Sequence, residues 1–250
     1  MTLIWVERIK LFSTRSPYWC LGAIVAAAAL FAVLIGLADH GTQAIAYFAL
    51  RGVALGQSIF MIMAALAVTT EYRFSTVRST FLAVPKRINV LLAKTVLLAA
   101  LGAVVGFISG IGAFFLTKAV AKQPPVPLTL TGDTWRQVAG YAALFAIAAV
   151  IAVAVGTLLR QSAGAIALLL LWPLLVEPLF TLIPNVGPKA GPWLPFRAGD
   201  TFVSPTSVIP GVPFEADPAR PTPVQGLLVF LATGVVLWVL AAFVLRQRDA

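Results

Sequence analysis

The chain has 250 residues, of which 60% are hydrophobic and 11% are charged, and its formal net charge is +9. Because charged residues make up about a quarter of soluble domains, this composition excludes an ordinary soluble domain and indicates several membrane spans. The basic excess lies mostly in loops expected to face anionic lipid, and we expect no nucleic-acid partner. The single cysteine, Cys20, excludes an intrachain disulfide, a cysteine-based zinc cluster and a CxxC redox pair.

The first segment, residues 1–16, predicts a helix that lies in the membrane surface. Trp5 and Ile9 fall on one side of this helix, whereas Glu7 and Lys10 fall on the other. Separate apolar and charged faces are typical of interfacial amphipathic helices. We therefore expect this segment to precede the first span without crossing the membrane itself.

Six stretches are apolar and long enough to cross a hydrocarbon core of about 30 Å, which takes roughly 20 helical residues. Six spans place both termini on one side. The segments on that side hold 11 Lys or Arg, against 7 in the opposite loops, so the positive-inside rule predicts that both termini are cytoplasmic. The predicted spans cover residues 18–38, 52–70, 92–117, 138–159, 163–183 and 226–245.

Two features of these spans predict how they are placed. Arg51 lies 20 positions before the acidic residue that follows its span, about 30 Å along a helix, so we expect it at the outer interface, with residues 42–50 as a helical extension. Gly102, Gly106 and Gly110 form a stripe that would let a neighbouring helix approach closely. We expect that neighbour within the same subunit, and a dimer contact is the alternative.

The most basic segment covers residues 71–94, between two apolar stretches without charge. Its apolar residues recur at intervals of three or four, which predicts a short amphipathic helix over residues 71–84. Pro85 would stop this helix because proline lacks an amide donor. The alternative is a plain loop whose Lys and Arg set the topology. The apolar positions are Phe74, Val77, Phe81 and Val84.

This segment resembles the first cytoplasmic loop of ABC-2 type permeases, the membrane subunits of many bacterial ABC exporters. In that family the loop holds a coupling helix that docks on an ATP-binding subunit. The resemblance implies that residues of this segment from Glu71 to Arg78 would contact that subunit. The family often has Gly where this chain has Ser75. The likeness is carried by Glu71, Tyr72, Arg73, Thr76 and Arg78, followed by Pro85 and Lys94.

The resemblance implies an all-α, six-span membrane protein with an N-terminal elbow helix and a short coupling helix. It implies a dimer, expected to be of identical chains, in the bacterial cytoplasmic membrane, with two copies of a separate ATPase that bind ATP and magnesium. The chain has no Gly-x-x-x-x-Gly-Lys-Ser/Thr phosphate loop of its own. The proline-rich segment 184–223 would hold short, partly re-entrant helices above the pathway, and a disordered surface loop is the alternative.

Glu177 is the only acidic residue inside a predicted span. Pro173 and Pro178 lie on either side of it, and each removes a backbone donor, so a kinked helix is expected. A carboxylate at this depth should turn away from lipid toward protein or water. We weigh a polar point on the substrate pathway against a structural carboxylate that pairs with Arg51 or caps the outer loop.

The sequence therefore favours a transport subunit that exports a hydrophobic or amphipathic substrate, such as a lipid, drug or glycolipid, by alternating access. We expect no enzyme activity, because the chain lacks His-Glu-x-x-His, Gly-x-Ser-x-Gly and paired intramembrane carboxylates. One alternative is a membrane-embedded enzyme that uses Glu177. Another is a secondary transporter that works without ATP, although no inverted repeat is evident.

Overall fold

The computed structural model describes residues 2–38, 46–84, 86–122, 128–130, 132–206 and 219–247. Within this part of the chain every regular element is a helix, which confirms the predicted all-α fold. The helices are α1 (Thr2–Phe12), α2 (Ser16–Leu37), α3 (Ala46–Ala49), α4 (Arg51–Arg73), α5 (Thr76–Ala83), α6 (Arg87–Val120), α7 (Gly132–Leu159), α8 (Ser162–Leu171), the π-helical turn η2 (Trp172–Val176), α9 (Glu177–Thr181), α10 (Gly187–Ala190), η3 (Gly191–Trp193), α11 (Pro195–Val203) and α12 (Pro223–Gln247).

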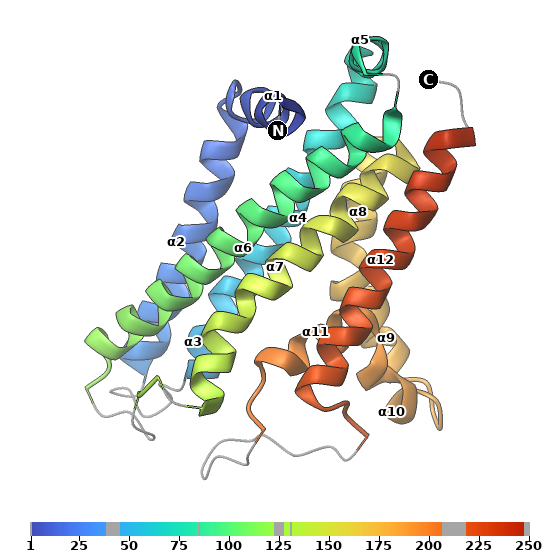
Figure 1. Ribbon diagram of the computed structural model, residues 1–250. Coiled ribbons are helices and arrows are strands. Elements are labelled where there is room, and N and C mark those ends of the chain that lie inside the picture. The colour runs from blue at the N-terminus through green and yellow to red at the C-terminus, as the bar shows by residue number, and fades with distance from the viewer. Residues whose placement is uncertain are drawn as a thin grey trace.

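Among the described residues, six helical segments are long and apolar enough to cross a membrane, as predicted. Figure 1 shows that both termini lie at one end of the bundle, together with α1 and α5, whereas α3, α9, α10 and α11 lie at the opposite end. We call these the α5 end and the α11 end. The six segments are Ser16–Leu37, Ala46–Arg73, Arg87–Val120, Gly132–Leu159, Ser162–Thr181 and Pro223–Gln247.

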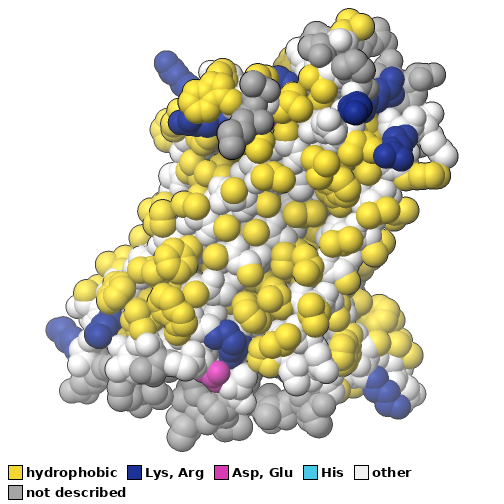
Figure 2. Space-filling view, viewed as in Figure 1, with side chains coloured by type: hydrophobic (Ala, Val, Ile, Leu, Met, Phe, Trp, Pro, Cys, Tyr) yellow, Lys and Arg dark blue, Asp and Glu magenta, His cyan; other side chains and the backbone are white. Residues whose placement is uncertain are grey.

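The bundle is organised around α7, which packs against α4, α6 and α12. In an apolar stretch of 18 residues within α7, 67% of the residues are buried inside the protein, whereas the corresponding share is 22% in both α2 and α12. The outer helices instead expose apolar side chains, as expected where lipid replaces water as the solvent. Figure 2 shows hydrophobic side chains over the middle of one face, with Lys and Arg gathered at its two ends.

The glycine stripe of α6 packs within the subunit, as predicted. A Cβ added at Gly102 would lie 2.9 Å from the carbonyl oxygen of Phe145, and one added at Gly110 would lie 2.5 Å from that of Val138. Both neighbours belong to α7. The missing side chains therefore allow the two backbones to approach closely.

The boundaries of the predicted coupling helix need a correction. Residues 71–73 continue α4 to its end at Arg73, and a separate helix, α5, begins only at Thr76. The break lies at Ser75, whose φ of 57° is left-handed, a conformation that glycine adopts without strain. Phe74 is 68% exposed, so it does not join the buried side that Val77 provides.

Two other predicted boundaries also differ. Span 3 begins earlier than predicted, because α6 runs for 34 residues from Arg87, so Lys94 lies two turns inside the helix. The predicted extension before Arg51 contains the short helix α3 and a turn at Leu50, and residues 42–45 lie outside the described part. Short helices occupy residues 187–203 of the predicted outer segment. Residues 207–218 of that segment lie outside the described part of the structure.

The N-terminal helix α1 runs across the α5 end of the bundle (Figure 1). Its charged side is turned inward, since Glu7 is buried, whereas Trp5 and Ile9 are exposed. This orientation suits a helix at a membrane surface, where the apolar side meets lipid and the charged side can find partners in the protein.

Candidate functional site

Four charged side chains meet at the α5 end, and we call Glu7, Lys10, Glu71 and Lys94 the ion cluster. Lys94 Nζ lies 2.6 Å from Glu7 Oε2 and 3.0 Å from Glu71 Oε1. It also donates to the carbonyl oxygen of Ala67 over 3.0 Å. An ammonium group has three N–H donors, so Lys94 is saturated by partners from α1 and α4.

Lys10 closes the cluster from the other side. Its Nζ lies 2.8 Å from Glu7 Oε1 and 3.3 Å from Glu71 Oε1, and it donates to Thr80 Oγ1 over 3.1 Å. Thr80 belongs to α5. The ion cluster thus joins α1, α4, α5 and α6 through two acids and two bases whose formal charges cancel.

Burial makes this arrangement sensitive to the loss of Lys94 or Glu7. The side chains of Lys94 and Glu7 are 8% and 4% exposed. Burial by itself would raise the pKa of Glu7, but the attraction of Lys94 and the hydrogen bonds from both lysines outweigh it and lower that pKa. Burial would likewise lower the pKa of Lys10, yet the hydrogen bond to Glu7 and the attraction of Glu71 raise it overall.

The residues predicted to contact an ATPase are divided by the structure. Glu71 turns into the ion cluster, where its side chain is 15% exposed. Tyr72 packs against Arg160 from the turn between α7 and α8, with the guanidinium carbon 5.1 Å from the ring centre. Glu71 and Tyr72 therefore support the α5 end from within.

Arg73 and Thr76 are exposed at the break before α5. The Thr76 hydroxyl donates to the main-chain oxygen of Glu71 over 3.4 Å, which ties the start of α5 to the end of α4. Arg78 lies in α5, but its side chain is outside the described part of the structure. Of the predicted contact residues, Arg73 and Thr76 are thus the two whose described side chains reach the surface.

Glu177 begins α9 directly after the π-helical turn η2. Pro173 and Pro178 flank it, and a π-helical turn is a recognised place for a helix to bend. The Glu177 side chain is only 1% exposed. Its two carboxylate oxygens accept the backbone N–H groups of Phe196 and Arg197, each over 2.9 Å.

These hydrogen bonds make Glu177 the cap of α11, whose own first residues supply no side-chain cap. The first turn of a helix has unpaired N–H groups and a partial positive charge, which a carboxylate satisfies. The predicted cap of the outer segment is therefore present. The alternative pairing with Arg51 is wrong, because the Arg51 guanidinium lies 3.3 Å from Asp200 instead.

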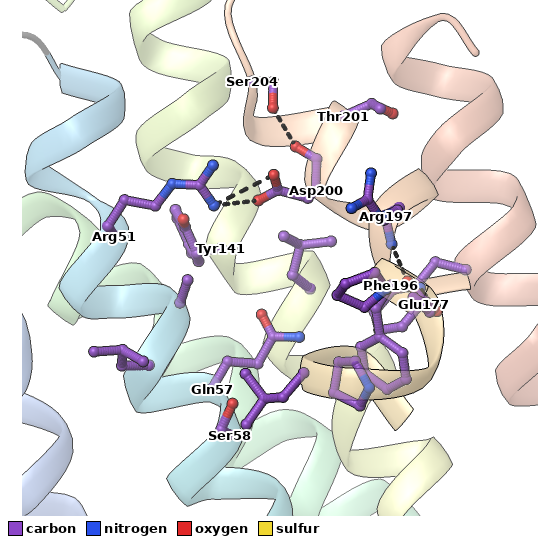
Figure 3. A pocket seen from close by; sticks show the side chains of 18 of the residues that line it. Arg51, Gln57, Ser58, Tyr141, Glu177, Phe196, Arg197, Asp200, Thr201 and Ser204 are labelled. Carbon is purple, nitrogen blue, oxygen red and sulfur yellow. Dashed lines mark hydrogen bonds and ion pairs between the residues drawn. The ribbon is translucent and has the colours of Figure 1, made fainter. Parts of the chain in front are cut away.

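A cavity of about 590 Å³ opens beside this cap, and we call it the outer cavity. Figure 3 shows it between α4, α7, the η2 turn and α11, with the Arg51–Asp200 pair above and the side chains of Gln57 and Ser58 below. Glu177 also lines this cavity. Its role on a substrate pathway stays a prediction.

Gln57 and Ser58 are not among the predicted site residues, although the sequence carries a signal for them. They are the only polar side chains of α4 between Gly52 and Val68. Polar residues inside a span tend to face protein or a cavity because lipid cannot satisfy them. An isolated polar pair within a predicted span is therefore a signal for residues that line a cavity.

No protein-family model matches the chain, and no curated protein is found to be similar to it. Among the described residues, no group of three or more His, Cys, Asp or Glu could hold a metal ion.

Proposed function

We propose that the chain is the permease subunit of an ABC-2 type exporter, in which α5 is the coupling helix. The observation that carries the proposal is the placement of α5, which lies beyond the ends of α4 and α6 at the tip of the bundle (Figure 1). A short helix at this position can contact a partner outside the membrane while staying attached to two spans.

The ion cluster supports this role because it connects α5 to the spans through short polar contacts. Thr80 of α5 contacts Lys10 of α1, so a displacement of α5 would move α1. Lys10 in turn contacts Glu71 of α4, and Glu71 contacts Lys94 of α6, so the displacement would also be transmitted to these two helices. In the proposed cycle, closure of an ATPase dimer moves α5, and this motion reorients the spans around a hydrophobic or amphipathic substrate by alternating access.

The proposed assembly contains two copies of this chain and two copies of a separate ATPase. ATP and magnesium bind to the ATPase, and both termini of the chain lie in the cytoplasm of a bacterial cell. Arg73 and Thr76, which are both exposed at the break before α5, are proposed to touch the ATPase, and Arg78 is a third proposed contact. The enzyme alternative is not favoured, since both oxygens of Glu177 already hold backbone N–H groups.

Co-purification tests the proposal. The tagged chain is isolated from its native membrane, and we expect it to bring down a separate ATP-binding protein in a complex of two plus two, whereas the chain alone should not hydrolyse ATP. Arg73→Glu should weaken the complex about tenfold or more, because hydrogen bonds to charged groups contribute about 1.5–3 kcal/mol. Arg246→Glu is the matched control, since Arg246 is exposed at the end of α12.

Two outcomes would overturn the proposal. One is transport by the purified chain alone along an ion gradient, which would indicate a secondary transporter. The other is the absence of any ATP-binding partner when the chain is isolated from its native membrane under conditions that preserve complexes.

A further inference from the structure

The outer cavity has the size and lining of a ligand site. Its volume of about 590 Å³ falls within the range of roughly 300–1,000 Å³ that is usual for small-molecule pockets. Apolar side chains from several helices form most of its wall, among them Met61 of α4, Leu144 of α7 and Leu174 of η2. Such a wall suits an aliphatic chain.

The charged groups around the cavity are balanced or exposed. Arg51 pairs with Asp200 over 3.3 Å, and both oxygens of Glu177 accept backbone N–H groups. Arg197 and Arg220 also line the cavity, but both are exposed, so solvent screens their charge. The buried part of the cavity therefore offers no unpaired charge that would attract an anionic or a cationic ligand.

Two uncharged polar groups that line the cavity, those of Gln57 and Ser58, have hydrogen-bonding capacity left. Among the described residues, neither the Gln57 amide nor the Ser58 hydroxyl makes a hydrogen bond, and both line the cavity. Figure 3 shows the Gln57 amide directed into the cavity. Gln57 lies six residues from Arg51, about 9 Å deeper along α4. Gln57 is half-buried, so its amide is accessible to a ligand that enters the cavity.

We propose that the outer cavity binds an uncharged amphiphile, a molecule with an aliphatic chain and a neutral amide, ester or hydroxyl group, and that Gln57 and Ser58 select that group. The amide of Gln57 offers two donors and one acceptor, and Ser58 offers one donor and an acceptor oxygen. A neutral head group satisfies them without bringing an unpaired charge into the cavity. The inference deepens the proposed transport function by naming a substrate class.

Photolabelling with a matched series of probes tests this site. Stearamide, stearate and stearylamine, each with the same diazirine on the chain, are irradiated with the purified chain in nanodiscs, and the labelled residues are mapped by mass spectrometry. We expect stearamide to label Met61 and Leu144 roughly three to ten times more than the two charged probes, the range that one or two hydrogen bonds provide.

Variants of one residue then test the selecting group. Gln57→Leu, which suits a membrane span, should reduce stearamide labelling to the level of the charged probes. Gln57→Glu should shift the preference toward stearylamine, because it adds a negative charge. Ser109→Ala is the control, since Ser109 is a buried hydroxyl of α6 that does not line the cavity. Equal labelling by all three probes, or stearamide labelling that Gln57→Leu leaves unchanged, would overturn the proposal.

A further arm separates a membrane lipid from a free amphiphile. A phosphatidylcholine with the diazirine on one acyl chain is used as the probe, and unlabelled stearamide is added in excess. Displacement by stearamide in the wild-type chain but not in Gln57→Leu supports the site with a lipid ester as one occupant. Lipid labelling that resists stearamide and ignores Gln57→Leu means bulk lipid fills the cavity and overturns the proposal. All these measurements use the chain alone, so their failure would leave the co-purification result intact.

Discussion

Lys94 of α6 and Glu7 of α1 form an ion pair of 2.6 Å in which both side chains are buried. The pair links the N-terminal helix to α6, which is one of the helices long and apolar enough to cross a membrane. Lys10 donates hydrogen bonds both to Glu7 and to Thr80 of α5. The ion pair is therefore connected to α5 through Lys10. The N-terminal helix is therefore a structural part of the α5 end.

Lys94→Met should strongly destabilise the chain. Removing one member of a buried ion pair leaves an uncompensated charge, which costs about 3–5 kcal/mol, and here the carboxylates of both Glu7 and Glu71 lose a partner. The midpoint of thermal unfolding in detergent measures the effect. Lys118→Met on the same helix is the matched control, since Lys118 is exposed. Equal midpoints in the two variants would show that the ion cluster is not structural.

The stability of the α5 end should depend on pH at both extremes. The folded pKa of Glu7 lies below its ordinary value of 4.5, so its contribution is present above pH 4.5 and is lost as the pH falls through the folded pKa. The folded pKa of Lys10 lies above 10.5, so its contribution is present below pH 10.5 and is lost as the pH rises through the raised value.

Between about pH 5 and pH 10, Glu7 and Lys10 should therefore cause no change in the midpoint of thermal unfolding. Glu7→Gln should remove its part of the acid-side loss, and Lys10→Met should remove its part of the alkaline-side loss. The same pH profile in the wild type and both variants would contradict the assignment.

Glu177→Gln tests the cap of α11. The side-chain amide keeps one acceptor but turns an N–H donor toward one of the two backbone N–H groups, so we expect a loss of about 1.5–3 kcal/mol. Hydrogen exchange should accelerate at Phe196 and Arg197 while the α5 end stays protected. A variant with normal exchange at α11 but an altered substrate response in the assembled complex would favour the pathway role instead.

Two glycines of α6 provide a comparison of packing. Gly110→Ala should destabilise the chain, because the new Cβ would lie 2.5 Å from the carbonyl oxygen of Val138 and α7 would have to move away. Gly112→Ala has open space around its Cβ and should be neutral or stabilising by up to about 1 kcal/mol, since alanine favours helix. Thermal unfolding compares the two variants, and the reverse order would exclude this packing.

The sequence alone determined the all-α class, the six spans and the placement of both termini at one end. These properties follow from the length and spacing of apolar stretches, because a membrane requires each span to be long, apolar and hydrogen-bonded within itself. The glycine spacing of α6 also predicted a close helix contact within the subunit. Each of these signals is local in the chain.

The partners of the charged residues were decided only by the tertiary structure. Glu71 was predicted to face an ATPase but turns toward Lys94, and Arg51 pairs with Asp200 and leaves Glu177 to cap α11. A buried charge takes whichever compensating group the packed helices bring within reach, and that group can come from any part of the chain. Which groups meet depends on how the helices pack, and spacing along the chain does not contain that information.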